Sequence, residues 1–549
     1  METNPKALRI QSLADAEPKA MGTASAGLKK LIQRNMYRWH RIIGILTVVP
    51  VIFWTLSGLS HPFMSHWFKP AIAHEFVKPE VLNHSQLTLS ITDVLTQNKV
   101  SVLRTFRLVE LAGQTYYQIK GADNQLRYYS ASTGRALPGG DQQYAEALAR
   151  YFVDDAKTPV HIEPVTTFSA EYRYVNRLLP VWKVSFDRPD QMDVYVETEQ
   201  SRLANYNERS RKAFLWVFNN FHNWDWLEAI TNNTLRVSIM VLCLSIIILS
   251  MVSGLVIYGF MWKRFRKPRN ASDRIGFLRK YHRQIGIAVS LVTLTFAFSG
   301  AYHVTRKLTP DERIKYVRQP VMTSAKLQAS ILSLPVDWAT VTNVSLATVD
   351  DRLYYQVFTK KANDSWKSKQ VDNAETSDKP SGKTKESKPT IAYYDVQTAS
   401  VLPDGVMAHA KDLVMSFWAA EQSGKGPACC ERMDEEQQVA AGELPDLLSI
   451  SFLEKFDREY GFINKRLPVV KLALDTPDHL TYYVEPSTSR LAARIVDSDR
   501  REGLSFAFLH KYSGIDFAGK DVRDSITMLA ALGVLVVSLF GLVLFLKIK

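Results

Sequence analysis

Cysteine is scarce in this sequence and is poorly placed for cross-links or metal ligation. Only three cysteines occur among 549 residues. Cys243 lies within an apolar run, and Cys429 and Cys430 are neighbours, between which a disulfide would be strained. These features exclude a disulfide framework and a zinc site. The sequence also lacks CxxCH, so covalent attachment of a c-type haem is excluded.

Two further absences narrow the function. No G-x-G-x-x-G motif follows a strand-like segment, so no nicotinamide or flavin domain is expected. Residues 1–30 are polar and lack the apolar core of a signal peptide, so the first apolar run is expected to be a retained membrane helix. The net charge is +13, but the basic residues cluster beside apolar runs. This pattern favours membrane topology over nucleic-acid binding.

Four apolar runs are long enough to cross a bilayer, which requires about 20 residues. We expect transmembrane helices at residues 42–67, 233–262, 282–305 and 523–547. The positive-inside rule places the tail 1–41, the basic loop 263–281 and the C-terminus in the cytoplasm. The two long segments, 68–232 and 306–522, are then expected outside, in the periplasm of a Gram-negative cell.

The chain repeats itself. YRWHRIIG (37–44) matches RKYHRQIG (279–286), and TLSGLSH (55–61) matches AFSGAYH (297–303). Residues 176–204 match 464–492 in the same way. Each half therefore reads as a helix, a large outer domain and a helix, which predicts a four-helix transmembrane bundle built from two tandem repeats.

Both outer segments show the period-two alternation of β-strands. TYYQIK (115–120) and RYYSASTG (127–134) predict one hairpin, and LYYQVF (353–358) and AYYDVQTA (392–399) predict another. Helical stretches lie between them, so each outer domain is expected to be α+β. The charged segment 360–389 is poor in apolar residues and is expected to be a flexible insertion.

Four histidines occupy matched positions at the ends of two predicted spans: His40, His61, His282 and His303. Within each span they are 21 residues apart, which is about 31 Å of helix and close to the thickness of the hydrocarbon layer. Three heptads return both histidines to roughly one face in a left-handed bundle. Each helix therefore carries one imidazole near its inner end and one near its outer end.

A glycine lies one turn from each of these histidines, on the membrane-ward side: Gly44, Gly58, Gly286 and Gly300. A missing side chain leaves room for a flat macrocycle against the helix, and imidazole is a common axial ligand of haem iron. The pattern predicts two b-type haems stacked across the bilayer. Proton relay, a metal ion bound by histidine and interface anchoring are the alternatives.

The pairing of the ligands stays open at this point. The symmetric choice is His40 with His282 and His61 with His303. In the competing choice, His222 completes an outer site with His61 or His303, and His510 does likewise, although both also fit interfacial positions.

The matched residues Arg236 and Arg523 lie at the start of two predicted spans. Each could pair with a haem propionate or could instead set the membrane topology by contact with lipid headgroups. The remaining histidines are interpreted as surface or loop residues: His66, His74, His84, His161, His409 and His479.

These segments resemble the PepSY-associated transmembrane-helix family of iron-regulated membrane proteins. The resemblance rests on RWHR…SGLSH, KYHR…SGAYH, the two PV-containing strand segments and the closing SGLVIYG-type helices, and it spans nearly the whole chain apart from 1–30 and 360–389. Members include di-haem ferric-siderophore reductases. The resemblance implies PepSY-like outer domains and implies haem iron ligation by His40, His61, His282 and His303, with His222 and His510 as further cofactor-binding candidates.

The combined expectation is a bacterial inner-membrane enzyme that transfers electrons through two haem b groups. It would reduce a periplasmic ferric siderophore or other ferric chelate and thereby release iron. The electrons would come from a separate cytoplasmic or quinol donor. Membrane lipid is an expected partner, and nucleic acid is not. The alternative is a PepSY-type sensor or peptide- or protease-binding protein without redox activity. A transporter ranks third, because Pro50 is the main irregularity in the spans.

Overall fold

A computed structural model describes residues 18–265, 274–308, 315–360, 391–422 and 444–547 of the chain. These residues form two compact units. The helical unit contains Met1–Trp67, Phe214–Thr309 and Leu504–Lys549, and the α+β unit contains Phe68–Ala213 and Pro310–Gly503. The expected insertion 360–389 lies outside the described residues, apart from its first residue.

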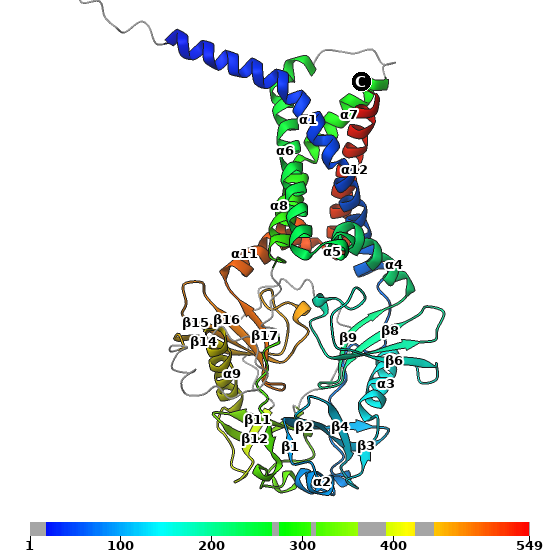
Figure 1. Cartoon of the computed structure of the whole chain (residues 1–549), viewed down its shortest axis with the longest axis vertical. Helices are drawn as coiled ribbons and strands as arrows, with labels where there is room; N and C mark the ends of the chain where they lie inside the picture. Colours follow the sequence, from blue (N-terminus) through cyan, green and yellow to red (C-terminus); the bar gives the residue numbers. More distant parts are fainter. Residues whose placement is uncertain (1–17, 266–273, 309–314, 361–390, 423–443, 548–549) are drawn as a thin grey trace, which may run out of the picture. The chain divides into compact units, whose positions relative to one another are not determined.

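Long apolar helices build the helical unit (Figure 1). Its main elements are α1 (Pro18–Pro62), α6 (Asn233–Phe265), α7 (Arg274–Ala288), α8 (Ser290–Thr305) and α12 (Lys520–Lys547). Short elements are η1 (Phe63–Trp67), η4 (Phe218–His222), α5 (Asp225–Ile230), η9 (Phe506–His510) and η10 (Ser513–Ala518), while α4 (Arg209–Val217) and α11 (Asp497–Ser505) continue into it from the α+β unit. Helix α1 packs against α6 and α12, α6 packs against α8, and α7 packs against α12.

Three of the described helices are long and apolar enough to cross a membrane, and a fourth span is added if the bent pair α7–α8 counts as one. Large apolar side chains on these helices, such as Leu242, Leu291 and Leu529, remain exposed in the isolated chain, as lipid-facing residues would. This confirms a membrane protein. The third predicted span, 282–305, was expected to be one helix, whereas α7 and α8 bend by 56°.

Local side-chain chemistry accounts for the bend. Ser290 Oγ donates to the carbonyl of Ile287 (2.8 Å), and Thr293 Oγ1 donates to the carbonyl of Val289 (2.9 Å). Hydrogen bonds of this kind compete with the helical ladder and bend helices. Gly533 of α12 provides the space, because a Cβ there would lie 2.7 Å from Val289 Cγ1.

A seven-stranded antiparallel sheet joins the two chain segments of the α+β unit, in the order β13-β12-β11-β2-β3-β4-β5. Its strands are β2 (Thr105–Leu111), β3 (Gln114–Lys120), β4 (Leu126–Ser130), β5 (Ala136–Leu137), β11 (Val341–Val349), β12 (Arg352–Thr359) and β13 (Ile391–Asp395). The segments meet where Ser345 of β11 pairs with Arg107 of β2. The predicted Tyr-rich hairpins are present as β3–β4 and β12–β13.

Each segment also forms a four-stranded antiparallel sheet with a helix packed on it. The first comprises β6 (Val160–Val165), β7 (Val181–Phe186), β8 (Asp193–Glu197) and β9 (Arg202–Asn207) with α3 (Gly140–Val153). The second comprises β14 (Leu447–Leu453), β15 (Val469–Leu474), β16 (Thr481–Glu485) and β17 (Arg490–Ile495) with α9 (Gly405–Gln422). Smaller elements are α2 (Ile91–Gln97), the pair β1 (Val102–Leu103) and β10 (Met322–Thr323), and the 3₁₀ turns at 84–86, 174–176 (η3), 324–326, 331–333 and 462–464 (η8).

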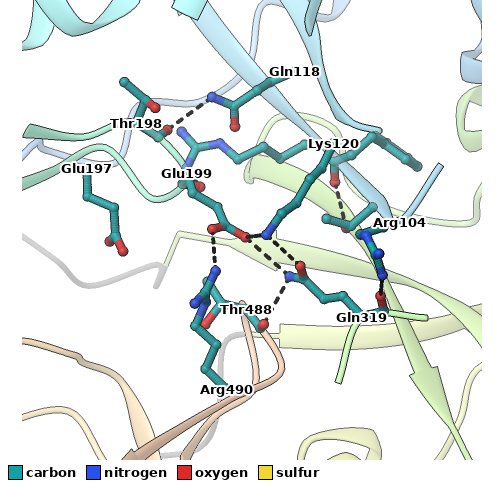
Figure 2. A network of polar contacts seen from close by, with 12 residues as sticks. Arg104, Gln118, Lys120, Glu197, Thr198, Glu199, Gln319, Thr488 and Arg490 are labelled. Carbon is teal, nitrogen blue, oxygen red and sulfur yellow. Dashed lines mark hydrogen bonds and ion pairs between the residues drawn. The ribbon is translucent and has the colours of Figure 1, made fainter. Parts of the chain in front are cut away.

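Buried ion pairs connect the two segments. Lys120 of β3 and Arg490 of β17 both contact the carboxylate of Glu199, at 3.0 and 2.7 Å, and Gln319 completes the group (Figure 2). In a second group, Glu485 accepts hydrogen bonds from Arg202 and from Arg466. Buried charges are stable only when paired, so each group fixes one segment against the other.

We expect Glu485→Gln to lower the free energy of unfolding of the α+β unit by about 3–5 kcal/mol, because it removes the buried charge that faces Arg202 and Arg466. Urea denaturation of the detergent-solubilised full chain, followed by tryptophan fluorescence, measures this loss. The matched control is Asp123→Asn, which breaks an exposed pair with Arg127 and should cost at most about 1 kcal/mol. Equal losses in both variants would contradict the assigned role.

Acid should destabilise the unit through the same residue. Burial raises the pKa of Glu485, but the charges of Arg202 and Arg466 outweigh it and lower this pKa from 4.5 to about 2. A carboxyl group with a depressed folded pKa stabilises the fold above its unfolded pKa, and this stability is lost as pH falls through the folded value. Between pH 4.5 and 2, the denaturation midpoint should fall more steeply in the wild type than in Glu485→Gln.

Candidate functional site

The first candidate pair lies between α1 and α7. The rings of His40 and His282 have centroids 6.4 Å apart and planes inclined at 59°. His40 comes from the first chain segment and His282 from a segment more than 200 residues later, and the packing of both helices against their neighbours brings the rings together.

Hydrogen bonds fix the tautomer of both rings. Nδ1 of His40 lies 3.1 Å from the carbonyl of Ser250 and 2.9 Å from Ser253 Oγ, and Nδ1 of His282 lies 2.9 Å from the carbonyl of Val537. A carbonyl can only accept, so Nδ1 carries the proton in each ring and Nε2 keeps its lone pair. Such a bond is the usual means by which proteins orient an imidazole that ligates a metal.

Two glycines make room for these rings. A Cβ on Gly254 of α6 would lie 3.2 Å from Cε1 of His40, and a Cβ on Gly541 of α12 would lie 3.2 Å from Cε1 of His282. A larger side chain at either position would therefore push the ring out of place. By contrast, a Cβ on the predicted Gly44 or Gly58 would meet nothing within 4 Å.

The second candidate pair is His222 with His510, whose ring centroids lie 6.3 Å apart at an angle of 82°. Each is the last residue of a π-helix, η4 or η9, and π-helices are frequent at functional sites. Trp54 of α1 donates to the carbonyl of His222 (2.9 Å) and stacks on Trp224 at 5.0 Å, which holds the end of η4 against α1.

The second pair repeats the tautomer of the first. Nδ1 of His222 lies 3.1 Å from Ser57 Oγ, and Nδ1 of His510 lies 3.1 Å from Ser299 Oγ. Both hydroxyls donate their proton to a carbonyl of their own helix, at 2.6 Å. Each therefore accepts from the imidazole, and Nε2 again keeps the lone pair.

The four rings are available as ligands. Burial lowers the pKa of His510 to about 3 and lowers the pKa of His222 well below its usual value, so both are neutral. Within the described part of the chain, no hydrogen-bond partner meets Nε2 of any ring in the two pairs. The described residues contain no group of three or more His, Cys, Asp or Glu suited to a bare metal ion. Two pairs of neutral imidazoles instead suit ions that need only two protein ligands.

His61 and His303 lie near the second pair. The ring of His61 lies 5.4 Å from Phe218, which stacks on His222 at 4.5 Å. The ring of His303 lies 4.2 Å from Phe506, which stacks on His510 at 4.8 Å. Each of these histidines thus contacts the same phenyl ring as one member of the second pair.

The two matched arginines have protein partners. Arg236 donates to the carbonyl of Asn223 (2.7 Å) and contacts Glu228 (3.1 Å). Arg523 contacts Asp516 (2.8 Å) and Asp524 (3.0 Å). Both side chains therefore stabilise the ends of their helices.

His409 was expected at the surface, and this prediction is wrong. It is fully buried in α9, with Nδ1 2.9 Å from the hydroxyl of Tyr393 and Nε2 3.2 Å from Ser489 Oγ. Burial lowers its pKa to about 3. Hydrogen bonds to both ring nitrogens satisfy a neutral imidazole inside the α+β core.

Sequence reasoning missed Gly254, Gly541, Ser57, Ser299 and the phenyl rings of Phe218 and Phe506. A signal for the glycines existed, because the closing helices share Gly-Leu-Val at 254–256 and 541–543. The serines lie in the S-G-x-x-H motifs beside His61 and His303. Their partners came from distant segments, so the motifs alone could not reveal them.

One family model, described as the PepSY-associated TM region, matches residues 116–330. The matched residues include the end of the first α+β segment, helices α6 to α8 and the start of the second segment. No curated protein matches the chain. The chain is thus similar to the PepSY-associated TM family over residues 116–330.

Proposed function

We propose that this chain is an inner-membrane electron-transfer protein that holds two haem b groups and reduces a ferric chelate, such as a ferric siderophore, on the periplasmic side. The observation that carries the proposal is the presence of two matched imidazole pairs with the same spacing and the same tautomer. We propose His40 with His282 for one haem and His222 with His510 for the other, in a four-helix bundle built from two repeats.

The spacing of the pairs fits axial ligation. Two imidazoles that bound one iron through Nε2 at about 2 Å would have ring centroids about 6 Å apart. The observed separations are 6.4 and 6.3 Å. Each pair also offers two lone pairs on Nε2, which is what bis-imidazole ligation of haem iron requires.

Bound haem supplies a one-electron Fe(III)/Fe(II) couple. The protein determines where that couple lies and how the ligands are oriented. Ser250, Val537, Ser57 and Ser299 accept the Nδ1 protons and thereby raise the basicity of the ligating nitrogens. Gly254 and Gly541 leave the space that the rings of His40 and His282 occupy. Phe218 and Phe506 stack on the rings of His222 and His510.

This assignment differs from the symmetric pairing of His61 with His303. His222 and His510 have ring centroids 6.3 Å apart and Nδ1 atoms held by serine hydroxyls, whereas His61 and His303 contact the phenyl rings of Phe218 and Phe506. We therefore propose that His61 and His303 shape the surroundings of the second haem and do not ligate its iron.

The ferric chelate follows from the chemistry of iron release. Hard oxygen ligands hold Fe(III) far more tightly than Fe(II), so one electron per iron loosens the chelate. The basic residues beside the spans place the α+β unit outside the cytoplasm under the positive-inside rule. The donor is a separate cytoplasmic protein or a quinol.

A visible absorption spectrum tests the proposal directly. Purified full-length protein should show reduced-minus-oxidised b-type bands and contain about two haems per chain, as each iron takes two imidazoles. Reduced protein should reoxidise when a ferric chelate is added. A colourless protein would instead support a sensor or a peptide-binding protein.

His40→Ala should reduce the haem content from about two to about one per chain, because it removes one axial ligand of the first pair. His222→Ala should have the same effect on the second pair. His61→Ala should retain both haems, and His66→Ala on η1 is the matched control. The pyridine haemochrome assay measures the ratio, and loss of a haem in His61→Ala with retention in His222→Ala would reverse the assignment of the second pair.

Gly254→Val should also remove or displace the first haem, because its side chain would collide with the ring of His40. The measurement is the haem content and the spectrum of the purified variant. Gly259→Val is the matched control on the same helix, since a Cβ there meets nothing within 4 Å. Similar spectra for both variants would show that the close approach of α6 to His40 is unimportant.

A further inference from the structure

The α+β unit contains a group of three cations: Lys465, Arg177 and Arg211. Lys465 follows η8, Arg177 follows η3 and Arg211 lies in the first turn of α4. The two 3₁₀ turns η3 and η8 lie against each other. In the part of the chain that the structure describes, none of these three side chains forms an ion pair. Other buried arginines of the unit are paired, as Arg466 and Arg490 show.

Lys465 has only neutral partners. Its Nζ donates to Asn176 Oδ1 at 3.2 Å and to the carbonyl of Ala204. Burial and the charge of Arg211 lower the pKa of Lys465 to about 7. Lys465 is partly buried, and a partly buried ammonium group is costly without a counter-charge, which a bound anion would supply.

The two arginines also lack part of their hydrogen bonding. Arg177 donates through Nη1 to the hydroxyl of Tyr174 (2.9 Å), and Arg211 donates through Nη1 to the carbonyl of Tyr206 (2.7 Å). Nε of both residues is buried without a hydrogen-bond partner. Glu208 is the acid that acts on Arg211 through its charge, and burial still lowers the pKa of Arg211.

The helices that follow β9 and β17 differ in charge at their first turns. Helix α4, which follows β9, begins with Arg209 and Arg211 and has no acidic residue in its first turn. Helix α11, which follows β17, has Asp497 and Asp499 in its first turn. A helix N-terminus favours negative charge, and at α4 only the preceding Glu208 supplies it within the described residues around that turn.

Exposed apolar side chains adjoin the cations. Val175 of η3 and Phe462 and Ile463 of η8 are 51%, 54% and 39% exposed. They lie two or three residues from Arg177 and Lys465 in the sequence. Such side chains suit a ligand that carries an apolar portion next to its charge.

We propose that Lys465, Arg177 and Arg211 bind an anionic ligand through a carboxylate or phosphate group, with η3 and η8 contacting its apolar portion. The ligand is either a small soluble anion or an anionic lipid headgroup. The site does not depend on the redox function proposed above, and its test requires no bound haem.

The experiment is chemical footprinting of Lys465 in the full chain, reconstituted in nanodiscs of zwitterionic lipid. An acetylating N-hydroxysuccinimide ester at pH 7.5 should modify Lys465, and peptide mass spectrometry reads the extent of modification. Citrate or inorganic phosphate should protect Lys465 in a saturable manner, whereas KCl at the same ionic strength should not. Nanodiscs that contain phosphatidylglycerol form the arm for a lipid headgroup.

Protection by citrate or phosphate identifies a soluble anion, and protection by phosphatidylglycerol alone identifies a lipid; both support the site. Exposed Lys78 is the internal control and should stay unprotected. Arg211→Gln should raise the anion concentration for half-protection about tenfold, because it removes one charged hydrogen bond. Exposed Arg135→Gln is the matched control. Absence of protection in every arm, or equal protection of Lys78, would overturn the proposal.

Discussion

The candidate site depends on one type of hydrogen bond, in which an imidazole gives its Nδ1 proton to an oxygen on another helix. All four rings of the two pairs make this bond, at 2.9–3.1 Å. The bond fixes the tautomer, turns Nε2 away from the acceptor and ties the orientation of the ring to the packing of the helices. An error in helix register would therefore change the chemistry of the site as well as its shape.

The packing of the helices depends in turn on small residues. Gly254 and Gly541 allow α6 and α12 to approach the rings of His40 and His282, and Gly533 accepts Val289 where α7 meets α8. Helices in lipid associate through close packing, because their apolar side chains gain little by leaving the lipid. Small residues at the contacts are thus the means by which this unit brings histidines from distant segments together.

In the α+β unit, charged side chains hold segments together that are distant in the sequence. Its two segments are separated in sequence by helices α5 to α8 of the other unit, yet their strands form one sheet and their charged residues pair across the junction. The carboxylates of Glu199 and Glu485 can remain buried only while arginines and a lysine from both segments surround them. Lys465 pairs with no carboxylate among the described residues, and the same physical reasoning supports the anionic ligand proposed for it.

The sequence by itself determined the elements whose physical cause is local. The length and apolar character of the runs determined that the chain is a membrane protein, and alternation of polar and aromatic residues determined the strands of the α+β segments. The tertiary structure decided what depends on distant partners: the bend at Val289, the burial of His409, the serines and carbonyls that orient the rings, and which histidine rings lie close together. Periodicity places a residue on the face of a helix, but only packing places that face against a particular neighbour.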